Sequence, residues 1–209
     1  MSPTNPIDGK AFKSFTWLQG RAIGLVNLHM DLHREDTGSH PCSADVLRGA
    51  VALGVASMDA YFTRRFAELL APFRKRNCPN QRLIELLSSA GLDTEAALEL
   101  AVTDRPFRRV RALVQRHLSD YTTQQFPAIN EFFLALGFKD LSKHAQGLAH
   151  RKTLLRSVEL LVERRHNIVH EGDIGHNGNL GRIDSSETVK RMRVFVSNAE
   201  VLILKSEEV

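Results

Sequence analysis

The sequence predicts an all-α, up-and-down helical bundle with additional short helices, folded as a single domain over residues 1–209. Apolar side chains recur at spacings of three and four residues along almost the whole chain, which is the pattern of one buried helix face. Residue types that begin and end helices separate these segments. No β-hairpin signal occurs between them. With 209 residues, of which 43% are hydrophobic, the chain is long enough to bury one core.

Two long amphipathic segments come first. After a flexible N-terminus of about residues 1–11, the first segment spans about residues 12–34 and ends at the polar turn REDTGSHP. The second begins near Ser43 and continues to about residue 70, where Pro72 and the basic stretch FRKRN are expected to close it. Its apolar stripe consists of Leu47, Val51, Val55, Met58, Phe62, Phe66 and Leu69.

Shorter helices follow, each marked by residues that start or stop a helix. Asn80 is an expected N-cap, and Gly91 lies just past the end of the helix that it opens. Asp93 and Asp104 are each expected to open another helix. The segment FPAINEFFLALGF (126–138) has a proline at its start and a glycine near its end, the usual asymmetry of a helix.

The last two helices are separated by a polar, glycine-rich loop over residues 172–184. The helix before the loop runs from about residue 150 to 171, and the helix after it begins at DSSE (184–187), an Asp-x-x-Glu capping pattern. One side of the earlier helix carries Leu154, Val158, Leu161 and Ile168.

Composition limits the class of protein. No apolar run approaches the roughly 18 residues that a membrane span needs, so we expect no membrane partner. The N-terminal residues lack the basic-then-apolar pattern of a signal peptide, which favours a cytoplasmic protein. Cys42 and Cys78 do not form a disulfide or metal-binding pattern. A net charge of +4 permits a nucleic-acid partner without requiring one.

The stretch VERRHNIVHEGD (162–173) concentrates the chemistry of the chain at the end of a helix. His166 and His170 are four residues apart, so their rings share one helix face. Arg165 lies between Leu161 and Ile168 of the apolar stripe and leans toward the packed side. The end of a helix favours a cation, which suits His170 to hold or deliver a proton near neutral pH.

Three interpretations of this stretch remain open from the residues alone. It can be a solvated helix end whose cations complement the helix dipole. It can be a metal site built on the two histidines with Asp173 and His176, although Asn167 stands where the metalloprotease pattern has a glutamate. It can also perform phosphoryl transfer without a metal, in which a guanidinium neutralises the phosphate and an imidazole moves the proton.

The pattern Arg165-His166-x-x-x-His170 resembles the Arg-polar-x(3–4)-His motif of the HEPN superfamily. The stretches DVLRGAVALGVASMDAYFTRRF (45–66), INEFFLALGFKDLSKHA (129–145) and LLVERRHNIVHEGD (160–173) resemble the RiboL-PSP-HEPN family in order and spacing. The resemblance covers nearly all of the chain beyond about residue 15.

The resemblance implies a HEPN-like helical bundle that dimerises and acts as a metal-independent endoribonuclease without a cofactor. It implies that Arg165, His166 and His170 carry the activity; many relatives have asparagine at the polar position. It also implies a setting in cellular defence or a toxin–antitoxin system, with an antitoxin or regulatory protein as partner. A catalytically silent HEPN-like bundle that binds RNA or a protein is the alternative.

Asp59 and Asn167 are the expected supporting residues. Asp59 interrupts the apolar stripe of the second helix and has no basic residue one turn away, so an ionised carboxylate there needs a partner from another helix. Arg165 is the candidate partner. Alternatively, Asp59 lies at the edge of the stripe and reaches water, Arg64 or Arg65.

The spacing of the motif also predicts a homodimer. Five residues along a regular helix put Arg165 and His170 about 140° apart with a rise of about 7.5 Å. One subunit cannot direct both side chains at one phosphate unless the helix loosens at residues 169–171. Two motifs that face each other across a symmetry axis remove this restriction.

Basic residues outside the motif are candidates for RNA binding. Arg164 is next to the motif and is expected to point outward. Arg105, Arg108 and Arg109 belong to the stretch RPFRRVR (105–111), in which only some arginines can line one groove. Aromatic side chains for base stacking are sparse, so contacts to RNA phosphates are favoured over base reading.

Overall fold

A computed structural model describes residues 9–35, 42–76, 79–119, 124–174, 181, 183 and 187–207. These residues form nine helices and no strand, so the predicted all-α fold is confirmed. Most of the expected flexible N-terminus, His176 and the capping residues 184–186 lie outside the described residues. None of the described helices combines the length and the apolar character that crossing a membrane requires.

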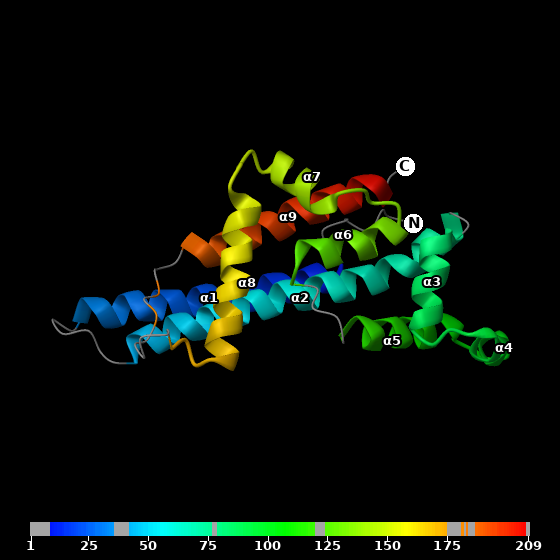
Figure 1. Cartoon of the computed structure of the whole chain (residues 1–209), viewed down its shortest axis with the longest axis horizontal. Coiled ribbons are helices and arrows are strands. Elements are labelled where there is room, and N and C mark those ends of the chain that lie inside the picture. Colours follow the sequence, from blue (N-terminus) through cyan, green and yellow to red (C-terminus); the bar gives the residue numbers. More distant parts are fainter. Residues whose placement is uncertain are drawn as a thin grey trace.

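Helix α2 (Ser43–Arg76) is the central element of the bundle. It runs antiparallel to α1 (Lys10–Glu35) along the long axis of the molecule, and α9 (Glu187–Glu207) packs on the same pair (Figure 1). Helices α5, α6 and α8 also contact it. All seven residues of its predicted apolar stripe are buried. The stripe therefore forms the contact surface for most of the molecule.

The end of α2 differs from the prediction. Pro72 was expected to close this helix, but α2 continues through the proline to Arg76. A proline removes one backbone hydrogen bond and strains the preceding turn, yet a long helix held by packing along most of its length can absorb that loss.

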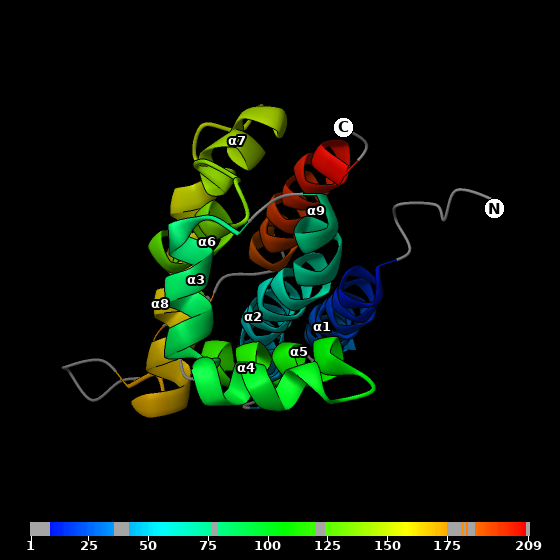
Figure 2. The same ribbon diagram turned by 90° about the vertical axis from the view of Figure 1, so that its right-hand side faces the viewer.

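The other helices cover α2 in two groups. Helices α6 (Phe126–Ala135), α7 (Leu141–Leu148) and α8 (Leu154–His170) lie over one side, and α8 crosses α2 steeply (Figure 1). Helices α3 (Gln81–Ser89), α4 (Thr94–Ala101) and α5 (Pro106–Ser119) gather toward the C-terminal end of α2 (Figure 2).

The predicted helix punctuation is confirmed at several positions. The Asn80 side chain accepts a hydrogen bond from the backbone N–H of Leu83 at 2.9 Å, and Asp93 caps α4 in the same way. Gly91 and Gly137 follow their helices with φ angles of +89° and +86°, which favour glycine.

Aromatic side chains join the layers of the core. Phe62 on α2 lies 5.7 Å, between ring centroids, from both Phe133 on α6 and Phe195 on α9. Each of the three is almost completely buried. The Phe62–Phe133 pair is edge-on, with an interplanar angle of 88°, and the Phe62–Phe195 pair is tilted by 44°. Edge-on aromatic pairs add to the stabilisation that burial itself provides.

A buried polar cluster lies beside this aromatic core. The Glu200 carboxylate on α9 accepts hydrogen bonds from the Tyr61 hydroxyl at 2.5 Å and from Arg65 Nε at 2.9 Å. Burial raises the pKa of the Tyr61 hydroxyl well above its usual value, and the adjacent negative charge and hydrogen bond of Glu200 raise it further. Arg65, considered above as a partner for Asp59, is thus bound to Glu200.

We expect Tyr61 to remain un-ionised in the folded protein at a pH near 10, about the pKa of a free tyrosine. Because the folded pKa is higher than the unfolded one, this hydroxyl contributes stability fully below that pH, and the contribution is lost as the pH rises through the folded pKa. The phenolate absorbance of wild type and Tyr61→Phe should therefore agree in native buffer near pH 10 and differ in urea by about half of one ionised tyrosine, because a free tyrosine is about half ionised at its pKa. A difference in native buffer would contradict the prediction.

Candidate functional site

The motif helix α8 keeps regular geometry up to His170 and then reverses sharply. The backbone N–H groups of Glu171 and Asp173 both donate to the carbonyl of Asn167, at 2.9 and 3.0 Å. Gly172 and Asp173 follow with φ angles of +63° and +60°. The helix therefore does not loosen before His170. Asn167 supports the helix end through its carbonyl, whereas a role for its exposed side chain stays a prediction.

The two histidines of the motif form a pair. His166 and His170 are both exposed, and their ring centroids lie 4.6 Å apart with the planes tilted by 43°. The predicted shared face is thus confirmed. Two imidazoles this close bring ring nitrogens that can donate and accept protons to the same location.

Arg165 faces a pocket between α2 and α8. The pocket has a volume of about 240 Å³ and is lined by Ala56, Asp59, Ala60, Thr63, Arg64, Gln124 and Arg165. Arg165 is half-buried, as its place next to the apolar stripe predicted. The pocket combines two guanidinium groups with a carboxylate and neutral hydrogen-bonding groups, so it can accept an anion at one part and polar hydrogens at another.

Within one chain, the ion pair between Asp59 and Arg165, one of the two interpretations of Asp59, is not formed. The two side chains line the same pocket, but no contact between their charged groups within 4 Å occurs among the described residues. Asp59 accepts a hydrogen bond from Gln124 Nε2 at 3.3 Å. Both charged groups are only half-buried, so water in the open pocket solvates them and neither depends on the other.

A buried ion-pair cluster behind the motif was not predicted. Asp173 Oδ2 accepts from Arg48 Nε and from Arg164 Nη2, each at 2.7 Å. Arg48 also donates to the carbonyl of Gly181 at 2.9 Å, and the Gly181 N–H donates to the carbonyl of Asp173. A Cβ at position 181 would lie within 3.0 Å of the Arg164 guanidinium and the Asp173 carboxylate, so a larger residue there would displace these groups. The cluster joins the end of α8 to α2.

The expected outward position of Arg164 is wrong. Its side chain is only 26% exposed, and its guanidinium is bound to Asp173. The buried carboxylate has already lost its water and attracts a second cation. Arg48 was the available signal, because an arginine within the buried stripe of α2 requires a carboxylate partner. Nothing in the sequence indicated which one.

The other predicted RNA-binding arginines lie apart from the motif. Arg105 and Arg108 are exposed, and Arg109 forms an exposed ion pair with Glu99 at 2.6 Å. Helix α5, which follows Arg105, is separated from the last turn of α8 along the long axis of the molecule (Figure 1). These residues could therefore contact only a different part of an RNA bound at the motif.

Asp173 is not available as a ligand for the metal site that the sequence left open. Asp173 binds two arginines, which occupy the carboxylate that would have served with the histidines. Within the described ranges, no three His, Cys, Asp or Glu side chains are grouped as a metal would require.

Comparison with known proteins identifies no relative. No protein-family model matches the chain, and neither a curated protein nor a solved structure is significantly similar to it. The activity of the chain therefore has to be inferred from its own residues.

Replacing Asp173 by alanine should destabilise the fold strongly. The change removes this carboxylate from Arg48, whose side chain is 9% exposed and therefore keeps a buried charge. Breaking a buried pair in this way should lower the free energy of unfolding by about 3–5 kcal/mol. Urea denaturation measures it. Asp45→Ala is the matched control, because Asp45 also pairs with Arg48 but is 67% exposed, and its loss should cost less than about 1 kcal/mol. Equal effects of the two substitutions would show that burial of Asp173 is not the cause.

Proposed function

We propose that the chain is a metal-independent endoribonuclease of HEPN type that acts as a homodimer in the cytoplasm. The observation that carries the proposal is that the last turns of one helix, α8, hold the pair of exposed imidazoles of His166 and His170 and, on another face, Arg165 at a pocket. This arrangement supplies the two functions that RNA cleavage without a metal needs, a fixed positive charge and groups that transfer protons. The resemblance of the motif to HEPN endoribonucleases supports the same activity.

In the proposed reaction, the RNA 2′-hydroxyl attacks the adjacent phosphorus. The O2′–P bond forms and the P–O5′ bond breaks, which leaves a 2′,3′-cyclic phosphate and a 5′-hydroxyl. One imidazole accepts the proton of the 2′-hydroxyl, and an imidazolium donates a proton to the leaving 5′ oxygen. Arg165 binds the phosphate and stabilises the negative charge that develops on its oxygens. His170 transfers a proton, and His166 positions it or shares this task.

The geometry of α8 supports the proposed dimer. Because the helix stays regular, one chain directs Arg165 toward its α2 pocket and the histidines toward solvent. The side chains of Arg165 and His170 leave the helix axis in directions about 140° apart. A second copy related by a two-fold axis would place its histidines opposite the first copy's arginine. Val169 and Ile174, which are 51% and 54% exposed beside the motif, offer apolar surface for this interface.

A catalytically silent HEPN-like scaffold that binds RNA or a protein is the second candidate. The same regular helix favours it, since the motif side chains of one chain do not converge. A defence or toxin–antitoxin setting, with an antitoxin or regulatory partner, belongs to the first candidate. Measuring cleavage separates the two.

Arg165→Ala and His170→Ala should each lower RNA cleavage by at least about 100-fold, because each removes a group that acts in the transition state. The assay uses labelled RNA with EDTA present and identifies the product termini. Arg156→Ala is the matched control: Arg156 lies on the same helix, and its ion pairs with Glu159 and Glu163 are exposed. Parental cleavage by both motif variants would favour the scaffold, and loss of wild-type cleavage in EDTA would favour a metal enzyme.

Mixing the Arg165→Ala and His170→Ala chains should restore part of the activity. In a composite dimer, each cleft uses the arginine of one copy and the histidine of the other. A mixed dimer then has one complete cleft, and an equal mixture should recover about one quarter of the parental rate. Refolding the chains together and measuring both cleavage and sedimentation tests it. Absence of any recovery in a confirmed mixed dimer, or a fully active monomer, would refute the composite site.

A further inference from the structure

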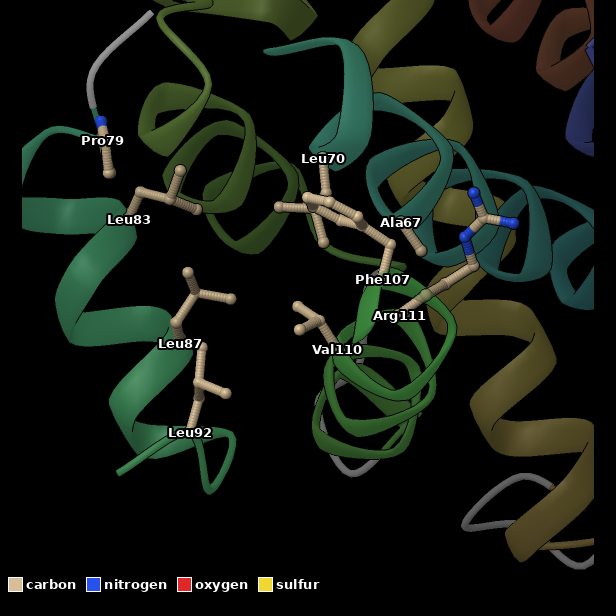
Figure 3. Close-up of a pocket in the computed structure, with 9 residues that line it drawn as sticks. All are labelled: Ala67, Leu70, Pro79, Leu83, Leu87, Leu92, Phe107, Val110 and Arg111. Carbon is tan, nitrogen blue, oxygen red and sulfur yellow. The ribbon is translucent and has the colours of Figure 1, made fainter. Parts of the chain in front are cut away.

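A small apolar pocket lies beside the C-terminal part of α2, where Ala67 and Leu70 line it. Figure 3 shows leucines of the α3 region, among them Leu83 and Leu87, on one side of it and Phe107 and Val110 of α5 on the other. Leu70 of α2 lies at its base. The lining is almost entirely aliphatic and aromatic carbon.

The arrangement of the helices explains why the pocket is not filled. Helix α5 packs on α2 and on α4, whereas α3 packs on α6. The apolar faces of α3 and α5 thus point toward each other while each helix is held by a different neighbour. Leu87 and Val110 remain half-buried as a result. Their exposed apolar surface has no partner among the side chains drawn in Figure 3.

The size of the pocket limits what it can hold. Its volume is about 70 Å³. Sites for cofactors and drug-sized ligands measure roughly 300–1,000 Å³. An engineered cavity that binds benzene measures about 150 Å³, so a nucleobase, with its polar edges, does not fit here. One branched aliphatic side chain of the size of valine or leucine does.

The positive charge near the pocket indicates which residues would flank the inserted side chain in a partner protein. Arg111 lines the pocket with its aliphatic stem, and its guanidinium lies beyond Ala67 (Figure 3). Arg105, Arg108 and Arg111 are exposed and form no ion pair with another described residue. Helix α5 contains no Asp or Glu. Carboxylates on a bound partner would therefore meet available guanidinium groups.

We propose that this pocket is a docking site for an acidic segment of a partner protein that inserts one aliphatic side chain. An apolar anchor in a pocket beside an arginine, here Arg111, is an arrangement found at the energetic centre of protein interfaces. Leu98 and Val102, which are 68% and 88% exposed on and just after α4, add apolar surface to the same group of helices. The proposal does not depend on the nuclease activity of the α8 site.

The test compares the affinities of two blocked pentapeptides for the protein. One has a central leucine flanked by glutamates, and the other has alanine in place of that leucine. Binding to the full chain is followed by the NMR signals of the Leu83, Leu87 and Val110 methyl groups. The leucine peptide should shift these signals and bind roughly tenfold more tightly than the alanine peptide, from the apolar area buried. Replacing the glutamates by glutamines should weaken binding and remove its dependence on salt. Equal affinities for the leucine and alanine peptides would refute an anchored side chain.

Variants of the protein locate the binding. Val110→Phe fills the pocket and should abolish binding, whereas Val201→Phe, which adds the same ring at an exposed position on α9 outside the lining, should not. Arg111→Glu should weaken binding of the acidic peptide, and Arg193→Glu, an exposed change on α9, should not. Neither phenylalanine variant should change RNA cleavage.

Two further results would overturn the proposal. One is wild-type affinity of the folded Val110→Phe protein for the leucine peptide. The other is a shift of the pocket methyl signals by an RNA oligonucleotide but not by the peptide, which would assign this surface to RNA. If Val110→Phe does not fold, the comparison of the leucine and alanine peptides on the wild-type chain still decides.

Discussion

The buried ion pair between Asp173 and Arg48 is the constraint on which the candidate site depends. It binds the reversal after α8 to the central helix α2, and Arg164 and the backbone of Gly181 complete its hydrogen bonds. Removing two charges from water is costly, so such a pair contributes less to stability than to selecting one arrangement. A different rotation of α8 would leave Asp173 buried without its cations. The orientation of the whole motif follows from this contact.

With α8 held in this way, the chemistry of the motif is divided between two surfaces. Arg165 faces the pocket that Asp59 and Gln124 also line, and the imidazoles of His166 and His170 face solvent. Each group is therefore accessible, but one chain does not direct them at one atom. A rigid helix end that is stable alone and complete only beside a second copy would link activity to assembly.

Two surfaces along α2, one at its middle and one toward its C-terminal end, differ in chemistry. The pocket beside α8 contains guanidinium, carboxylate and amide groups and is open to water, which suits a phosphate. The pocket between α3 and α5 is small and apolar, which suits a side chain.

The sequence by itself determined the features that depend on near neighbours. Helix periodicity placed the α2 stripe, Asn80 was recognisable as a cap, and the spacing of His166 and His170 put their rings on one face. Such features are set within a few residues along the chain, where helix geometry is known in advance. Tertiary structure decided which charges meet. Arg48 and Asp173 are 125 positions apart, and either could have paired with many other groups. Asp59 and Arg165 were correctly placed near each other but do not touch, because an open pocket lets water solvate both charges, and sequence carries no measure of that space.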